Sequence, residues 1–279
     1  MSDVPVLREV RGPTALGGGR RRALELLYLL AITDFKRHYI GTALGYLWSI
    51  ARPLLLFGVL LAVFTQVFRL GSEVAHYPVL LLLNIVLFGF FQEATAAAVT
   101  SIVAQEGVVR KTQFPRLVIP LSIVLTGLFT LALNLVVVFA FVLASGVDPR
   151  WTWLGLPVVI AGLAVLTAAV SMIVSSLYPR FRDMAIIWSV ASIVLFYGSP
   201  VLYPIEKVPQ ALREIVMLNP LASLLELARK WVVDADAPGP AAAAGGAWRL
   251  LAPLAVAVAV CVLASWLFAR EARRIAEEL

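Results

Sequence analysis

A short cationic segment separates two long apolar stretches of the sequence. Residues 107–120, GVVRKTQFPRLVIP, place Arg110, Lys111 and Arg116 beside two prolines, between two long apolar stretches. We interpret residues 105–114 as a short helix ended by a proline, which can begin the next apolar helix because the N–H it lacks is not needed there. Such a helix would form a rigid cationic knob against which a partner protein pushes. A solvated loop that serves only membrane topology explains the same residues equally well.

Glu93, within GFFQEATAAAVTSIV, is the one acidic residue well inside an apolar stretch. Carboxylates in lipid are costly and normally face a cavity or a partner, so Glu93 is a candidate for the polar lining of a translocation path. The alternative is a hydrogen bond between helices, a role that also suits Gln92 and Asn134. The other apolar stretches hold no series of such groups, which argues against a proton-driven carrier.

Motifs for catalysis or nucleotide binding are absent from the sequence. There is no G-x-x-x-x-G-K-[ST], H-E-x-x-H or G-x-S-x-G. The two histidines, His38 and His76, are expected on opposite faces of the membrane, so they cannot share a metal or act as a pair. The acidic residues expected outside are dispersed: Asp148, Glu206 and Glu214. We therefore expect no catalytic residues and no metal site.

The composition indicates a chain that is mostly surrounded by lipid. Of its 279 residues, 61% are hydrophobic and only 14% are charged, with a mean hydropathy of +0.91. A soluble domain is about one quarter charged. The net charge of +6 comes from basic residues that flank apolar stretches, which favours membrane orientation over nucleic-acid binding. The single cysteine, Cys261, allows no internal disulfide.

Six apolar stretches are long enough to cross about 30 Å of hydrocarbon at about 1.5 Å per residue. They must be helices, because every backbone N–H and C=O in lipid needs an internal partner. The sequence therefore predicts an all-α integral membrane protein, with one transmembrane domain at residues 24–279 after a disordered cytoplasmic tail at residues 1–23. The six predicted spans are 47–68, 77–103, 117–143, 153–178, 184–202 and 248–269.

Two further stretches are neither spans nor short loops. Residues 24–46 repeat apolar side chains at helical spacing but are interrupted by charges, which predicts an amphipathic helix at the inner interface. A frayed start of the first span is the alternative. Residues 200–233 contain four helix-breaking prolines and predict two short re-entrant or interfacial helices at the outer face. Residues 234–248, rich in Ala, Gly and Pro, predict a flexible outer connector.

The distribution of Lys and Arg predicts the orientation. Most of them fall in segments that share one side of the membrane if the N-terminus is inside. Cytoplasmic loops carry such an excess. We therefore expect a multi-pass protein of the plasma (inner) membrane with both termini in the cytoplasm.

Aromatic side chains are abundant near the ends of the predicted spans. Interfacial anchoring explains most of them. Some of them could instead stack against sugar rings in a path for saccharides. The candidates for that path, beside Glu93, are Trp48, Phe90, Phe91, Phe196 and Tyr197.

Several segments together resemble the permease subunits of type-2 ABC exporters, especially those that export O-antigen and teichoic-acid polysaccharides. They are DFKRHYIGTALGYLWSIARPLL (34–55), RKTQFPRLVIPLS (110–122), YPRFRDM (178–184), FYGSPVLYPIEKVP (196–209) and LNPL (218–221). They occur in order and cover the chain apart from the N-terminal tail, the outer connector and the last span. Jointly they are specific, although none is so alone.

The resemblance implies a half-transporter that pairs with a second copy of itself. Two copies of a separate ABC ATPase would supply the energy, so ATP and Mg²⁺ are expected in that partner and no cofactor in this chain. The ATPase would touch the interfacial helix at residues 34–37 and the coupling helix at about 105–114. The expected contact residues are Asp34, Phe35, Lys36, Arg37, Val109, Arg110, Lys111, Thr112, Gln113 and Phe114.

The expected cargo of this family is a polymer carried on a polyprenyl-pyrophosphate lipid. Arg37, Arg52 and Arg182 are candidates for pairing with the pyrophosphate near the inner face. Ordinary anchoring at the inner face is the alternative for all three. The same family also exports drugs and small lipids. A stand-alone membrane enzyme or a channel is a further alternative, which the lack of a clustered acid–base site argues against for the enzyme.

Overall fold

The structure is a computed structural model that describes residues 19–39, 45, 47–68, 74–105 and 116–278. Within these ranges every regular element is helical. The predicted all-α class is therefore confirmed for the described part of the chain. The predicted coupling helix falls almost wholly in residues 106–115, which lie outside the described ranges.

Five helical segments of the described chain are long and apolar enough to cross a membrane. The shortest, at 21 residues, reaches about 30 Å at about 1.5 Å per residue. They correspond to five of the predicted spans. They are α2 (Leu47–Ala62) extended by the π-helix η1 (Val63–Val67), α3 (Tyr77–Val99), α6 (Val118–Ala144), α7 (Leu156–Leu177) preceded by η3 (Trp151–Gly155), and α12 (Leu251–Glu278) preceded by η6 (Ala247–Leu250).

The predicted span at 184–202 is a shorter helix. It forms α8 (Met184–Gly198), whose 15 residues reach only about 22 Å. The helix stops because Ser199 precedes Pro200 and adopts an extended backbone, with φ −108° and ψ 154°. A residue before proline is disfavoured in the helical region by the proline ring. The structure thus contains five membrane-length helices among its described residues, where we expected six spans.

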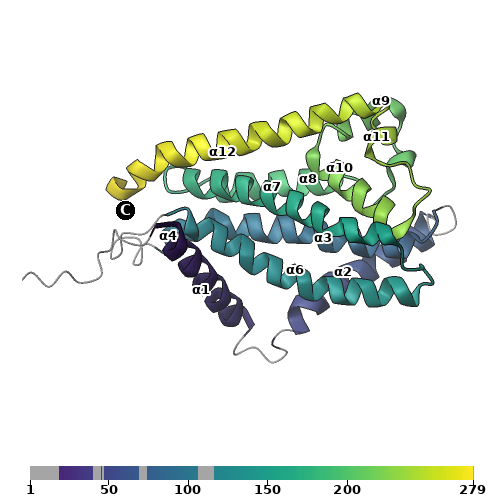
Figure 1. The fold of residues 1–279 in the computed structure, drawn as a ribbon, viewed down its shortest axis with the longest axis horizontal. Helices are drawn as coiled ribbons and strands as arrows, with labels where there is room; N and C mark the ends of the chain where they lie inside the picture. The colour runs from purple at the N-terminus through teal and green to yellow at the C-terminus, as the bar shows by residue number, and fades with distance from the viewer. Residues whose placement is uncertain (1–18, 40–44, 46, 69–73, 106–115, 279) are drawn as a thin grey trace, which may run out of the picture.

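Helix α3 forms the centre of the molecule. Its apolar window is 78% buried, whereas that of α2 is only 6% buried and that of α12 only 11%. Helices α6 and α7 run alongside α3, and α12 lies along α7 (Figure 1). Burial on nearly all sides explains why α3 is apolar all round and lacks an amphipathic pattern.

The two ends of the bundle differ in what they carry. At one end, here called the α4 end, the short α4 (Ser101–Ala104) follows α3, α1 (Gly19–Tyr39) begins, and α12 ends (Figure 1). The opposite end, here called the α10 end, carries α9 (Gln210–Val216), α10 (Pro220–Ala228) and α11 (Pro240–Ala243) (Figure 1).

Helix α1 crosses α6 obliquely (Figure 1). It begins at Gly19 rather than at residue 24, so the end of the segment that we expected to be disordered is helical. The Thr126 hydroxyl of α6 donates a hydrogen bond to the Ala31 carbonyl at 3.1 Å, and the rings of Phe35 and Phe129 meet edge to face at 5.9 Å. These contacts hold α1 against α6 along its apolar face.

The α10 end is built from short helices, and the prolines predicted two short helices in residues 200–233. Their re-entrant or interfacial placement at the outer face stays a prediction. Between α8 and α10 lie η4 (Ile205–Lys207) and α9, and η5 (Arg229–Val233) follows α10. The segment 234–248 is not a free connector, however. Its small side chains pack into a cluster with Ile205, Met217 and Ala222, which buries Ala243 and Ala244. Alanines are small enough for this packing, a possibility that composition alone did not reveal.

Candidate functional site

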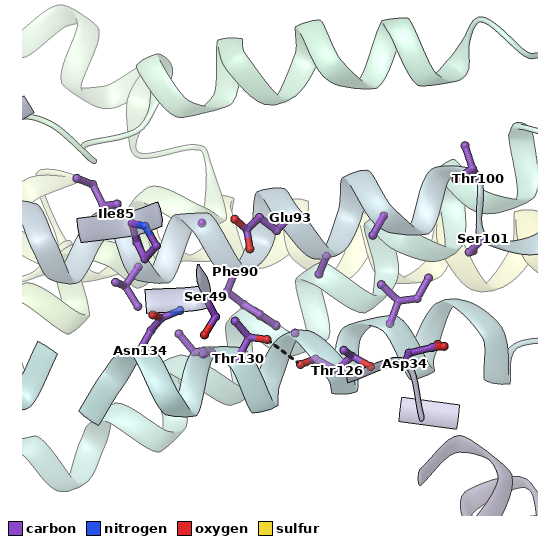
Figure 2. A pocket seen from close by; sticks show the side chains of 18 of the residues that line it. Asp34, Ser49, Ile85, Phe90, Glu93, Thr100, Ser101, Thr126, Thr130 and Asn134 are labelled. Atoms are coloured by element: carbon purple, nitrogen blue, oxygen red, sulfur yellow. Dashed lines mark hydrogen bonds between the residues drawn. The ribbon is translucent and has the colours of Figure 1, made fainter. Parts of the chain in front are cut away.

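A cavity of about 570 Å³, lined mostly by apolar surface with several polar groups, lies between α1, α2, α3, α4 and α6 (Figure 2). Its volume falls in the range of sites for small molecules. One side is formed by α3 and the other by α6, with Ser49 reaching in from α2 (Figure 2). No Lys or Arg lines it among the described residues. Its polar lining consists of Asp34, Ser49, Glu93, Thr100, Ser101, Gln105, Thr126, Thr130 and Asn134.

The α6 side of the cavity is a polar stripe that our reading of the sequence missed. Thr126, Thr130 and Asn134 line the cavity and recur every four residues, so that successive members are neighbours on the helix surface. Ser122, four residues before Thr126, is completely buried and does not line the cavity. The Thr126 hydroxyl shares its one hydrogen between the Ser122 carbonyl at 2.9 Å and the Ala31 carbonyl at 3.1 Å, and the Thr130 hydroxyl donates to the Thr126 carbonyl at 3.4 Å. The four-residue spacing of polar residues in a strongly apolar span was the signal that could have revealed this wall.

Glu93 faces this cavity and also contacts another helix. Its Oε1 lies 3.4 Å from Nη1 of Arg52, with 56% of the Glu93 side chain and 79% of the Arg52 side chain exposed. Arg52 follows the start of α2 by five residues and Glu93 precedes the end of α3 by six. At about 1.5 Å per residue both are about 8–9 Å from those helix ends. The pair neutralises two charges that would each be costly in lipid.

Reversal of the charge at Arg52 tests this pair. Arg52→Glu places a second carboxylate beside Glu93, so we expect a lower melting temperature of the purified chain. The exchange Arg52→Glu with Glu93→Arg should recover part of the loss. An exposed pair is worth about 0.2–1 kcal/mol in water. Arg182→Glu is the control for the change of net charge. The Arg182 guanidinium lies over the Tyr178 ring at 5.2 Å, so this reversal should not be recovered by Glu93→Arg. An equal loss in the single variant and the exchange would contradict the pairing.

The predicted path residues are spread over several places. Phe90 lines the cavity with Glu93. Phe91 is buried in the core, where its ring contacts Trp188 at 6.1 Å. The remaining three are Trp48, exposed at the start of α2, and Phe196 and Tyr197 at the end of α8, of which Tyr197 is exposed. Ring contacts through Phe88 connect Phe91 to Phe196 and Tyr197. The role of the five aromatic residues in a path stays a prediction.

The three arginines proposed for a pyrophosphate have different surroundings. Arg52 contacts Glu93, as described above. Arg182 stacks on Tyr178 in the turn between α7 and α8. The backbone of Arg37 belongs to α1, but its side chain lies outside the described part. Their role also stays a prediction.

The predicted ATPase contacts are only partly described. Asp34 on α1 lines the cavity, and Phe35 packs against Phe129 of α6. Lys36 follows them on the same helix. The remaining residues of the second contact segment lie outside the described ranges: Val109, Arg110, Lys111, Thr112, Gln113 and Phe114.

A buried charged cluster at the α10 end was also missed. Nη1 of Arg229 lies 2.7 Å from Oε2 of Glu206 and 3.4 Å from Oε2 of Glu226. The side chains of Arg229 and Glu226 are only 5% and 2% exposed. The three-residue spacing of Glu226 and Arg229 was visible in the sequence, but the approach of Glu206 depends on the tertiary fold. In the described chain no three His, Cys, Asp or Glu side chains form a metal-binding group.

Stability should depend on pH through Glu226. Burial raises the pKa of this carboxyl to about 7, against the opposing effect of Arg229. A pKa raised in the folded state favours folding when the group is protonated. The stabilisation is therefore complete below about pH 4.5 and is lost as the pH rises through about 7. We expect the melting temperature to fall over that range, and Glu226→Gln to flatten the fall. Glu214→Gln should keep the wild-type profile, and a slope unchanged by Glu226→Gln would contradict the assignment.

Known proteins resemble this chain over most of its length. A family model described as ABC-2 type transporter matches residues 25–232. The O-antigen export system permease protein RfbA of Klebsiella pneumoniae is 34% identical over 203 residues, which is 72% of this chain and 77% of the relative. RfbA of Myxococcus xanthus is 29% identical over 72% of this chain and 77% of its own length. The polysialic acid transport protein KpsM of Escherichia coli is 23% identical over 73% and 80%. The matched region runs from α1 to η5 and includes the cavity.

Proposed function

Because this chain belongs to the ABC-2 type transporter family, we propose that it is the membrane permease subunit of an ATP-driven exporter of a cell-envelope polysaccharide. The likeness to the O-antigen export permeases carries this proposal, since one of them is 34% identical over 72% of the chain. Five membrane-length helices are consistent with a subunit embedded in the membrane. The cargo that we propose is a glycan linked to a polyprenyl-pyrophosphate lipid.

We propose that the energy comes from a second protein. The sequence has no P-loop, so ATP and Mg²⁺ would bind in a separate ABC ATPase. We propose that two such subunits act on two copies of this chain, at residues 34–37 and about 105–114. The start of α1, the short α4 and the end of α12 share the α4 end (Figure 1). This arrangement supports a cytoplasmic α4 end with both termini on that side.

The proposal also covers the membrane in which the protein lies and the residues that would meet the cargo. We place the protein in the plasma (inner) membrane, in contact with lipid along α2 and α12, whose apolar windows are largely exposed in the single chain. The pyrophosphate would be met by Arg37, Arg52 or Arg182 near the α4 end. The cavity itself, which has carboxylate, hydroxyl and amide groups but no cationic lining residue among those described, suits the uncharged hydroxyl groups of sugars better than a pyrophosphate.

Co-purification of this chain with a P-loop ABC ATPase from the same host tests the proposal. We expect the two proteins to form a stable complex, and loss of this chain to leave the polysaccharide on the inner face of the membrane. An ATPase whose P-loop lysine is replaced should assemble but not export. The proposal fails if the chain alone transports the polymer, or if cells without the chain display normal surface polysaccharide.

A further inference from the structure

Helix α3 reaches both functional ends of the molecule. At the α4 end it leads through α4 and Gln105 into residues 106–115, where we propose contact with the ATPase. Its other end lies beside the segment 199–205, which joins α8 to the short helices of the α10 end. It runs for 23 residues with its only proline in the first turn, so no internal kink interrupts it.

Two buried side chains tie α3 to the segment 199–205. The Tyr77 hydroxyl donates a hydrogen bond to the Leu202 carbonyl at 2.8 Å. Nδ2 of Asn84 donates one to the Pro200 carbonyl at 2.9 Å. Tyr77 is 0% and Asn84 is 2% exposed. Seven residues separate them, which is about two helical turns, so both point to the same face of α3.

The segment that they hold is in turn bonded to α10. Nδ2 of Asn219 donates to the Ser199 hydroxyl at 2.9 Å, and Oδ1 of Asn219 accepts from the Leu221 N–H at 3.0 Å, which caps α10. Val201 is completely buried. A continuous set of hydrogen bonds therefore connects α3, the segment 199–205 and the first turn of α10.

Asn84 is an unusual residue for packing alone. It lies in a helix whose surrounding residues 79–83 and 85–88 are all buried and apolar. Its Oδ1 has no hydrogen-bond partner among the described residues, so of the two polar atoms of the amide only Nδ2 is hydrogen-bonded. A buried polar group left partly unsatisfied is unfavourable, and leucine would fill the same space without that penalty. The bond to the Pro200 carbonyl is the feature that only a donor at this position provides.

From these contacts we propose that α3 moves as one rigid unit between the two ends of the bundle, a role here called the connecting rod. Tyr77 and Asn84 are the positioning residues that transmit its movement to the α10 end. The inference rests on the proposed function, because the driving movement comes from the ATPase. When the α4 end of α3 is displaced, the two hydrogen bonds carry the segment 199–205 with it, and Asn219 passes the shift to α10. Hydrogen-bond networks and rigid secondary elements are the structures that carry coupling between distant sites.

The test compares loss of the two hydrogen bonds made by Tyr77 and Asn84 with loss of a buried hydroxyl that bonds only within its own helix. The paired variant Tyr77→Phe with Asn84→Leu removes both bonds and keeps the shape of the side chains. Tyr77→Phe alone is the milder form in case the pair folds poorly. Thr167→Val is the matched control, because the Thr167 hydroxyl is also completely buried but donates at 2.7 Å to Leu163 of its own helix.

Each variant would be reconstituted with the ATPase in lipid vesicles. A reporter cysteine at the exposed Gln210 of α9, with Cys261→Ser to remove the native thiol, measures movement at the α10 end by its rate of thiol labelling. In the unaltered chain we expect trapping of the ATPase with ATP and vanadate to change this rate. In the paired variant ATP hydrolysis should continue while the change in labelling disappears and export falls about tenfold.

Each outcome separates the two proposals. If the reporter responds to the trapped nucleotide in the unaltered chain, and responds equally with normal export in the paired variant, then the connecting-rod proposal is wrong. A loss in Thr167→Val as large as in the paired variant would also overturn it, because any buried hydroxyl would then have the same effect. If the unaltered chain binds no ATPase, the proposed function fails before the role of α3 arises.

Discussion

Arg229→Met should lower the melting temperature of the purified chain by roughly 10 °C, the largest effect on stability that we expect. The Arg229 side chain is only 5% exposed and lies between Glu206 and Glu226. Its removal leaves the buried Glu226 carboxyl without a cation, and breaking a buried ion pair typically costs about 3–5 kcal/mol. The measurement is thermal unfolding in detergent at pH 8, where Glu226 is expected to carry its charge.

Two further variants show whether the loss comes from the unpaired charge. Arg150→Met removes an exposed arginine from the loop after α6 and should leave the melting temperature unchanged. Arg229→Met combined with Glu226→Gln removes both members of the most buried pair, so it should be more stable than Arg229→Met alone. If the single and the combined variant melt together, charge pairing is not the cause.

Charge reversal at Arg110 and Lys111 should have the largest effect on activity. We expect the variant Arg110→Glu with Lys111→Glu to reduce export by at least about tenfold, because it reverses two charges in the proposed ATPase contact and removes the electrostatic complementarity on which such a contact depends. The expectation comes from the sequence, since both residues lie outside the described ranges. Surface polysaccharide and the ATP hydrolysis of the assembled transporter are the two quantities to measure.

The control for this variant is a second pair of neighbouring cations. Arg273 and Arg274 lie near the end of α12, which we also propose to be cytoplasmic. Arg273→Glu with Arg274→Glu changes the net charge of that side by the same amount. If both variants are inserted normally but only the first loses export, the cationic segment acts as a contact surface. If export is normal in both, the alternative of a loop that serves only topology is correct.

Hydropathy predicted the long helices because a membrane span is a local property of the chain. The predicted spans 47–68 and 117–143 differ from the observed helices by only one residue at their ends. The prediction for α8 was too long because we extended the apolar run through Ser199 and Pro200, although the residue before a proline resists the helical conformation. The steric restriction on the residue before Pro200 should have ended the predicted helix, even though the apolar composition continues beyond it.

The candidate site was less accessible to sequence reasoning. Glu93 was recognised because it is an isolated charge in an apolar stretch. Its approach to Arg52, 41 residues earlier, depends on how α2 and α3 pack. The bonds of Tyr77 and Asn84 to carbonyls more than one hundred residues away leave no periodic pattern, because any residue offers a backbone carbonyl.

The shortness of α8 has a consequence for the surrounding lipid. Its length of about 22 Å falls about 8 Å short of a hydrocarbon core of about 30 Å. A helix shorter than the bilayer is accommodated by local thinning, at a modest free-energy cost for each ångström of mismatch. Where α8 meets lipid, short acyl chains therefore match the protein better than long ones, so the protein should favour regions of thinner bilayer.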